Sequence, residues 1–543
     1  MRICEECNQE HHGWCKPCNS KHFKNNFDKW TSGNEKIDKF IQDAQLYANG
    51  WWKVIEWIPY DRFSDTKEIA KGGFGTIYYA NWIGGRIDKW DIENQQWKRW
   101  GQREVVLKKF DNFANLNEEF LNEMVIHLKT MNHLSYSIRI YGITKDPENN
   151  KYMIVFEYMP DGNFRDYLKN HFDNINWNNK LRYLRLLAHY FRYFHNLDIV
   201  HQDFHPGNIL SYDYNYGNLY ISDFGLSKIV GQNIENPHNK NIFGVLPYIS
   251  PEVLCGEEYT KAADVYSFGI IAYELITGFA PYYDVPHDRD LARQICNGLR
   301  PKIPFHTPKI ITGIIMRCWD ARVTHRPTFE ELDEEFSKYH RDYWENNYQN
   351  VNEITIQIDN AEKISKLLTN TTTINPYNYQ THPEAIFTSR LLNYSSLPKF
   401  KNDENFEKEL EETINYTSAS NVSIEKSISE RIPCSFKLYG IFIGIGFICC
   451  IKSARAENID AMYNVGCCYD NDIDKLFLKA AEKKYSIAQY NLGDCYEIDR
   501  DEAKAFEWFE KVAENVVRIF FNKINLMTMQ SLFVFRCNVF IIF

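Results

Sequence analysis

The feature that most constrains the fold of this 543-residue chain is a pair of short motifs whose aspartates lie 20 residues apart. The first motif, His201-Gln-Asp-Phe-His-Pro-Gly-Asn208, contains Asp203 and ends in an asparagine, and the second is Asp223-Phe-Gly. Asp203 can accept the proton of a hydroxyl group. Asn208 and Asp223 offer the hard oxygen ligands that Mg²⁺ prefers. The pattern predicts a site that handles phosphate together with a magnesium ion.

A glycine-rich stretch precedes these motifs, Ala70-Lys-Gly-Gly-Phe-Gly-Thr-Ile77. Glycine lets a hairpin bring its backbone N–H groups close to phosphate oxygens. Ala70 stands where a full G-x-G-x-x-G pattern has its first glycine, so the stretch alone is equally typical of a plain hairpin. The residues expected to contact a nucleotide here are Ala70, Gly72, Gly73, Phe74, Gly75 and Ile77.

A lysine and a glutamate complete the constellation. Lys108 ends the apolar run Val105-Val-Leu-Lys, and Glu123 follows 15 residues later on a stretch with helical periodicity. A lone lysine at the end of a strand is usually a solvated charge. Here its ammonium can reach phosphate oxygens while the carboxylate of Glu123 holds it extended.

These motifs, followed by Ser250-Pro-Glu252 and Asp264-Val-Tyr-Ser-Phe-Gly, occur in the order typical of protein kinases, and the chain resembles that family over about residues 63–340. The resemblance implies an α+β, bilobal protein kinase fold with a strand-rich N-lobe and a helical C-lobe, and implies ATP and Mg²⁺ as substrate and cofactor. It places an adenine-binding hinge from Glu157 to Met159, with Phe156 as the gatekeeper. Arg326 is the expected buried partner of Glu252. The apolar pattern predicts a strand over 151–159 and helices over 117–130, 178–196 and 263–277.

Three departures from the family pattern bear on regulation and substrate. Gln202 replaces the arginine that usually pairs with an activation-loop phosphate, and residues 228–247 contain no serine, threonine or tyrosine. We therefore expect activity without activation-loop phosphorylation. His205 stands where serine/threonine kinases have a catalytic lysine, and Val245 stands where they have threonine. The segment around Val245 is similar to the tyrosine-kinase-like group, which favours Ser/Thr over Tyr as the acceptor.

Four cysteines near the start form two C-x-x-C pairs, Cys4 with Cys7 and Cys15 with Cys18. Four thiolates complete a tetrahedral site, so the spacing predicts structural Zn²⁺ in a segment too short to bury its own core. Four free thiols are the alternative, and a redox role is a third reading. This block, together with Phe27-Asp-Lys-Trp-Thr-Ser-Gly-Asn34, resembles the leader of an expanded fungal kinase family, some of whose members carry C-terminal Sel-one-like repeats.

The sequence divides into segments of different composition. We expect a Cys-rich zinc knuckle (1–35), a lead-in segment (36–62), the kinase domain (63–340), a low-order linker with an apolar run (341–454), Sel-one-like helical repeats (455–515) and an atypical apolar tail (516–543). The linker, rich in Asn, Thr and Ser, is expected to hold one helix near 403–414. AMYNVGCCY at 461–469 is repeated as AQYNLGDCY at 488–496, which resembles Sel-one-like repeats that bind a protein partner.

Composition excludes some partners. The net charge of −10 argues against a general nucleic-acid binder, and the start, MRICEEC, lacks an apolar signal-peptide core, so we expect a reducing, cytoplasmic setting. The apolar run 438–451 is shorter than the about 20 residues of a spanning helix, and we expect no membrane contact. Translated non-coding sequence is the alternative explanation for this run and for the tail.

Two functions remain open from the sequence. The first is an active protein kinase in which Lys108 and Glu123 orient phosphates, Asn208 and Asp223 bind Mg²⁺, and Asp203 is the base, with His205 beside it. The second is a pseudokinase scaffold that binds partners through its repeats, which the departures at positions 70, 202, 205 and 245 favour. Autophosphorylation with Mg-ATP, compared with Asp203→Asn, discriminates between them.

Overall fold

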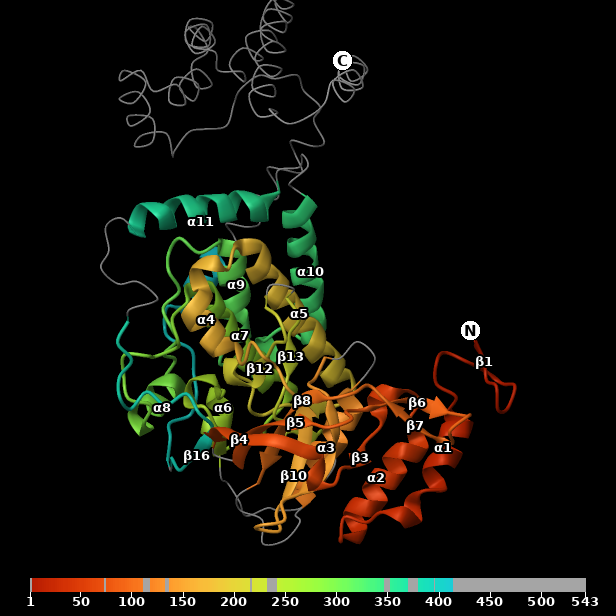
Figure 1. Ribbon diagram of the computed structural model, residues 1–543. Helices are drawn as coiled ribbons and strands as arrows, with labels where there is room; N and C mark the ends of the chain where they lie inside the picture. The colour runs from red at the N-terminus through yellow and green to blue at the C-terminus, as the bar shows by residue number, and fades with distance from the viewer. Residues whose placement is uncertain are drawn as a thin grey trace, which may run out of the picture. The chain divides into compact units, whose positions relative to one another are not determined.

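A computed structural model provides the structure of the chain (Figure 1). It describes residues 2–72, 75–110, 118–131, 136–214, 217–231, 242–345, 352–369, 379–394 and 396–413. All of these belong to one compact unit, Met1–Ser429. The repeats expected at 455–515, the apolar run 438–451 and the tail 516–543 lie outside the described residues.

A six-stranded sheet forms the small lobe, in the order β3-β9-β10-β8-β5-β4. Its strands are β3 (Glu56–Trp57), β4 (Phe63–Gly72), β5 (Gly75–Trp82), β8 (Arg103–Lys109), β9 (Ile140–Lys145) and β10 (Tyr152–Glu157). Neighbouring strands are antiparallel except β3, which pairs parallel to β9. Helix α3 (Glu118–Thr130) packs on the sheet through Phe120 and Met124, which are buried with Ile140 and Ile154. The strand and helix expected here are confirmed.

The N-terminal segment packs onto this lobe. It contributes β1 (Arg2–Ile3), β2 (Glu10–His11), α1 (Lys16–Lys24) and α2 (Glu35–Tyr47), and a hairpin of β6 (Ile87–Asp91) and β7 (Gln96–Arg99) lies against it. Asn34 caps α2 by accepting from the N–H groups of residues 36 and 37. Ile37 and Ile41 on the apolar face of α2 enter the same core as α3. Trp14 and Phe23 stack on Trp97 of the hairpin.

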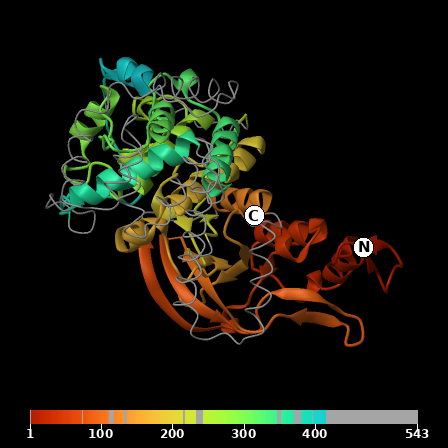
Figure 2. The ribbon, with the colours of Figure 1, turned by 90° about the horizontal axis from the view of Figure 1, so that it is seen from above.

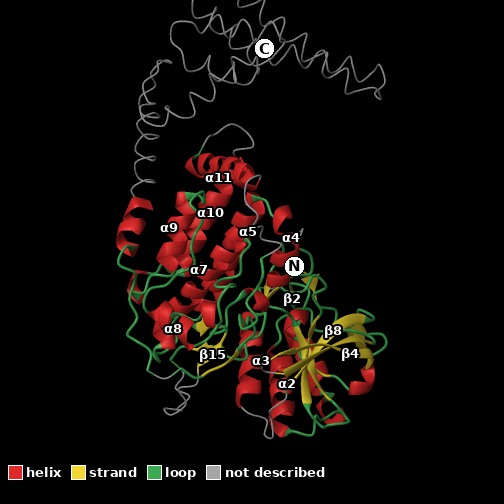
Figure 3. Cartoon of the chain, turned by 90° about the vertical axis from the view of Figure 1, so that its left-hand side faces the viewer, coloured by secondary structure: helices red, strands yellow, loops and turns green. Residues whose placement is uncertain are grey.

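The large lobe is helical (Figure 3, helices in red). Its helices are α4 (Phe164–His171), α5 (Trp177–Asn196), α6 (Pro251–Leu254), α7 (Lys261–Thr277), α8 (Arg289–Cys296), α9 (Lys309–Cys318) and α10 (Phe329–Glu345). The strands are short: β11 (Ile199–Val200), β12 (Ile209–Leu210), β13 (Tyr220–Ile221), β14 (Lys228–Ile229) and β15 (Ile242–Gly244). Helix α7 is buried from Ala263 to Thr277 because most of its side chains are apolar on every face, and many of them lie in the main core. The helices expected over 178–196 and 263–277 are confirmed. Figure 2 shows the strands of the small lobe beside the helices of the large one.

Beyond the large lobe the chain turns back onto it. Helix α11 (Glu353–Thr369) buries Ile354, Ile358 and Ala361 in the main core, and strand β16 (Arg390–Leu392) pairs with β15. We name residues 379–394 and 396–413 the return segment. The expectation of a low-order linker is wrong for α11 and for the return segment, because apolar residues spaced three or four apart give α11 a buried face that average composition conceals. The helix expected near 403–414 is present over residues 406–413.

Within the described residues, none of the helices is both long enough and apolar enough to cross a membrane.

Candidate active site

Lys108 joins the two lobes. It sits in β8, with Val105 and Leu107 of the same strand fully buried, and its Nζ lies 2.8 Å from Glu123 Oε1 on α3 and 2.8 Å from Asp223 Oδ1 of the large lobe. Burial alone would lower the pKa of Lys108, but the two carboxylates outweigh it and raise the pKa above its ordinary value. For Asp223, burial alone would raise the pKa, but the positive charge of Lys108 has the larger effect, and the pKa of Asp223 is lowered. The ammonium and Asp223 therefore stay charged at neutral pH.

Asp223 is held in place by the residues that follow it. Its backbone adopts φ +59°, and its Oδ1 accepts from the N–H of Gly225 at 3.4 Å. Phe224 is fully buried, with its ring centre 4.7 Å from that of His127 on α3 and 5.1 Å from that of His201. This column of rings links α3 to the loop that bears Asp203.

Asp264 of α7 anchors the loop of Asp203 through hydrogen bonds to its backbone. The buried Asp264 carboxylate accepts from the backbone N–H of His201 at 3.0 Å and of Gln202 at 3.3 Å. Asn208 reaches back to donate from Nδ2 to the Asp203 backbone carbonyl at 2.9 Å and to its Oδ2 at 3.3 Å. Asn208 thus holds the backbone and the carboxylate of Asp203 in one position.

His205 lies beside Asp203. Its Nδ1 accepts from the N–H of Gly207 at 3.1 Å, so in the neutral ring the proton resides on Nε2. Nε2 lies 3.5 Å from Asp203 Oδ1 and 3.2 Å from the hydroxyl of Ser389. The histidine can therefore supply one hydrogen bond at the position where related kinases have a lysine.

The described residues of the glycine-rich stretch lie at the end of β4 and the start of β5. Ala70 pairs with Ile77, and Gly72 with Gly75, in the antiparallel register. A Cβ on Gly75 would lie 2.1 Å from the Lys109 carbonyl oxygen, so only glycine fits there. Gly73 and Phe74, two residues expected to contact nucleotide, lie outside the described residues.

The expected hinge follows β10. Phe156 is buried, with its ring 5.0 Å from that of His127, and Met159 is buried in the same cluster. The Glu157 N–H donates to the Arg139 carbonyl at 2.9 Å, and its carboxylate accepts from Arg103 at 3.1 Å. The structure thus places Phe156, Glu157 and Met159 at the junction of the lobes.

After residues 232–241, which lie outside the described residues, β15 ends at Gly244 and is followed by Val245. A Cβ on Gly244 would lie 3.2 Å from Ile249 and 3.4 Å from Asp203 Oδ1, and the residue has φ +137°. Glu252 accepts from Arg326 through both carboxylate oxygens, at 2.7 and 2.8 Å. This buried pair, expected from the sequence, is confirmed and holds the end of the segment in place.

One residue of the site was missed by sequence analysis. Ser389 of the return segment donates from Oγ to Asp203 Oδ2 at 2.5 Å. It lies in a stretch whose composition predicted a linker. The local signals that this stretch would pack are two short apolar pairs, Ile386-Phe387 before Ser389 and Leu391-Leu392 after it.

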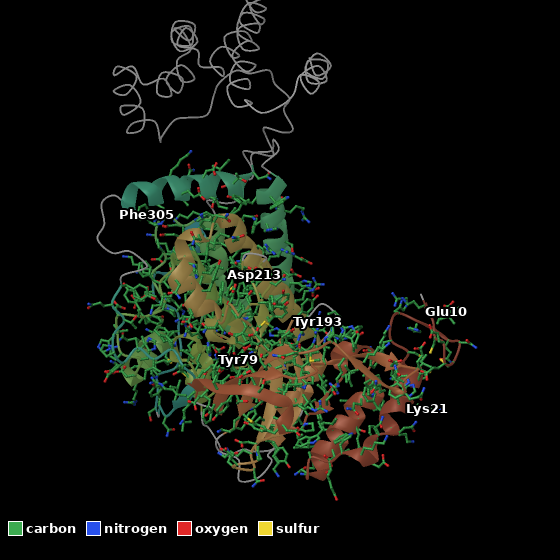
Figure 4. The ribbon with its side chains drawn as sticks, in the orientation of Figure 1. Glu10, Lys21, Tyr79, Tyr193, Asp213 and Phe305 are labelled. Atoms are coloured by element: carbon green, nitrogen blue, oxygen red, sulfur yellow. The ribbon has the colours of Figure 1, made fainter. Side chains whose placement is uncertain are left out.

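The four N-terminal cysteines converge. The loop of the β1–β2 hairpin carries Cys4 and Cys7, and the start of α1 carries Cys15 and Cys18; the four Sγ atoms lie within 4.8 Å of one another. Glu10 and Lys21 mark this hairpin and helix in Figure 4. The closest pairs are 3.5 and 3.7 Å apart, near the about 3.8 Å expected for thiolates around one tetrahedral Zn²⁺. Burial alone would raise the pKa of Cys4, but hydrogen bonds from the backbone of Cys7 and Glu6 outweigh it and lower the pKa to about 7.

The chain has a strand-rich lobe and a helical lobe, and Lys108 is held between the carboxylates of Glu123 and Asp223. These features are those of a protein kinase domain. The family model for protein tyrosine and serine/threonine kinases matches residues 63–336, half of the chain, and the chain belongs to this family.

Named relatives agree with this assignment. The chain is 31% identical over 301 residues to a serine/threonine-protein kinase/receptor of Acanthamoeba polyphaga mimivirus, covering 55% of this chain and 16% of the relative. Two probable serine/threonine-protein kinases of Dictyostelium discoideum are also 31% identical. One match covers 43% of this chain and 14% of the relative, and the other covers 55% and 10%. The chain thus matches only a small part of the length of these relatives.

Proposed function

We propose that this chain is an ATP-dependent protein kinase that transfers the γ-phosphate to a protein hydroxyl, with Ser/Thr favoured over Tyr. The observation that carries the proposal is the joint placement of Lys108, Glu123 and Asp223 at one point and of Asp203 against a hydroxyl group. The names of the relatives support a serine or threonine acceptor. In the structure the hydroxyl group that donates to Asp203 belongs to Ser389, so the site accommodates a serine side chain.

Each group has a role in this proposal. Lys108 would bind phosphate oxygens, and Glu123 keeps its ammonium extended. Asp223 and Asn208 carry oxygen donors that suit Mg²⁺, which when bound with ATP neutralises phosphate charge. Asp203 would accept the proton of the hydroxyl, and the imidazole of His205 would orient that hydroxyl.

Regulation is proposed to differ from the common loop-phosphate switch. Gln202 has no cationic group to bind a phosphate, and residues 228–247 have no hydroxyl to carry one. The ion pair between Lys108 and Glu123 is formed in the structure without a phosphate on residues 228–247. We infer that the kinase is active without activation-loop phosphorylation.

The Cys-rich block is proposed to hold structural Zn²⁺ through Cys4, Cys7, Cys15 and Cys18, because the sulfur positions fit a tetrahedral ion. Protein purified without chelator should contain about one zinc per chain, and removal of the zinc should lower the midpoint of thermal unfolding. Unchanged stability after complete removal would contradict a structural role.

The remaining parts of the proposal rest on sequence resemblance. They are membership of the tyrosine-kinase-like group, kinship with the fungal family that has a Cys-rich leader, and binding of a protein partner by the repeats at 455–515. A cytoplasmic setting for signal transduction is proposed as well. The second candidate is a pseudokinase scaffold, favoured by the departures Ala70, Gln202, His205 and Val245.

The test is transfer from labelled Mg-ATP to a panel of Ser, Thr and Tyr peptides, with EDTA as the blank. Transfer that depends on Mg²⁺ and falls mainly on Ser and Thr peptides is the expected result. Binding of ATP without transfer to any acceptor would contradict the enzyme and favour the scaffold.

A further inference from the structure

The return segment brings one of its own hydroxyls to the catalytic aspartate. Ser389 Oγ lies 2.5 Å from Asp203 Oδ2 and 3.2 Å from His205 Nε2. Resting on the proposed kinase activity, we propose that Ser389 is an intramolecular phosphoacceptor: the chain phosphorylates its own return segment, which occupies the acceptor position until then.

The backbone on one side of Ser389 is fixed by strand pairing. In the β15–β16 ladder Gly244 pairs with Arg390, Phe243 with Leu391 and Ile242 with Leu392. In chain order the paired part of β16 therefore begins at Arg390, one residue after Ser389, and Gly244 at this end of the ladder lies beside Asp203. Since a Cβ at position 244 would press on Asp203 and Ile249, glycine allows this close approach.

Side chains and backbone fix the other side of Ser389. The buried His287 donates from its N–H to the Glu384 carbonyl at 2.9 Å, and its Nδ1 lies 2.9 Å from the Ile386 carbonyl. Arg165 of α4 donates to the Phe387 carbonyl at 2.7 Å, and its guanidinium lies 4.8 Å from the centre of that ring. The serine is thus held from both directions.

The contacts continue beyond the strand. Leu392 is buried in a cluster with Leu246 and Ile295, and Lys401 donates its N–H to the Cys296 carbonyl at 2.9 Å. Asn402 accepts from the Ala321 N–H at 2.7 Å. A segment anchored at this many points behaves as a tethered ligand, whose high effective concentration favours transfer within one chain.

The hydrogen bonds suit phosphoryl transfer. His205 donates from Nε2 to Ser389 Oγ, and the serine hydroxyl donates to Asp203. In the reaction the serine oxygen attacks the γ-phosphorus of ATP while its proton passes to Asp203. The bond from that phosphorus to the β,γ-bridging oxygen breaks, and ADP leaves with the electron pair. Asp203 then releases the proton to solvent, and the product phosphate, with about two negative charges, repels the restored carboxylate and drives the segment out of the acceptor position.

The experiment uses the full chain with Mg-ATP. Mass spectrometry locates and quantifies phosphate on the peptide that contains Ser389, over an about hundred-fold dilution series of protein, with a Ser/Thr peptide added in a parallel arm. Ser389→Ala should lose this phosphate. Thr388→Ala, a change at the exposed neighbouring hydroxyl, should keep it.

The expected result is phosphate on Ser389 at a first-order rate that does not change with dilution. A rate that rises in proportion to protein concentration would overturn the intramolecular assignment. Transfer to the added peptide with none on Ser389 would overturn the inference and leave the proposed function standing. Absence of transfer to every acceptor would overturn both.

Discussion

Leu392 offers a direct way to weaken the contact between the return segment and the kinase domain. Its side chain is 2% exposed, within a cluster formed by α6, α8 and the loop after β15. Leu391, the preceding residue on the same strand, is 44% exposed and faces away from this cluster. Leu392→Ala and Leu391→Ala therefore remove the same atoms from opposite faces of β16.

The expected magnitudes differ by more than tenfold. A buried leucine replaced by alanine costs about 2–5 kcal/mol, and we take about 2–3 because a strand at the edge of the core can relax. At about 1.4 kcal/mol per factor of ten, docking of the segment should weaken about 30- to 150-fold. The exposed Leu391→Ala should change it by no more than about twofold, since surface substitutions stay within about 0.5 kcal/mol.

Hydrogen–deuterium exchange on the full chain measures this docking. Amides of the peptide spanning 387–394 should lose protection about 30- to 150-fold in Leu392→Ala and almost none in Leu391→Ala, while peptides from α7 stay protected in both. Equal effects of the two substitutions, or unchanged protection in Leu392→Ala, would refute the packing of β16 described above.

Three further predictions concern buried polar groups. Arg326→Met leaves the buried Glu252 carboxylate unpaired and should lower the free energy of unfolding in urea by about 3–5 kcal/mol; a loss below about 1 kcal/mol would contradict this. His127→Leu should raise that free energy by about 1–2 kcal/mol, because both ring nitrogens are buried with no hydrogen-bond partner among the described residues; a destabilised variant would refute it. Burial lowers the pKa of Lys180 from 10.5 to about 7, and Glu362 opposes this with a smaller effect. Between pH 7 and pH 10 the lysine is therefore protonated in the unfolded chain and largely neutral in the folded one. The stability of the wild type relative to Lys180→Met should therefore rise from pH 7 to pH 10, and a difference independent of pH would contradict it.

Much of the site could be predicted because its chemistry depends on fixed spacing. Lys108, Glu123 and Asp223 meet from three separate parts of the chain. Short motifs mark Lys108 and Asp223, and Glu123 is found from its helical stretch 15 residues after Lys108. The pairing of Glu252 with Arg326 was also within reach, since a buried carboxylate needs a cationic partner. Helix α5 could be predicted from its apolar periodicity, and helix α7 from its long, mainly apolar run.

The return segment could not be predicted, because its contacts are set by the surface on which it lies. Backbone carbonyls, as at Ile386 and Phe387, accept many of its hydrogen bonds, and a backbone group carries no residue signature. The polar composition around Ser389 resembles that of a linker. Likewise, strand β3 has only two residues, and its place beside β9 depends on packing of the N-terminal helices.

The central claim is that Asp203 acts as the base of an active kinase. The most direct measurement compares the wild type with Asp203→Asn in the rate of phosphate transfer from Mg-ATP to a serine peptide, alongside the affinity of each for ATP. Transfer should fall at least about 100-fold while ATP affinity stays within about threefold, since the side chain acts on the hydroxyl and lies apart from Lys108. Equal transfer rates for the two proteins would contradict the account.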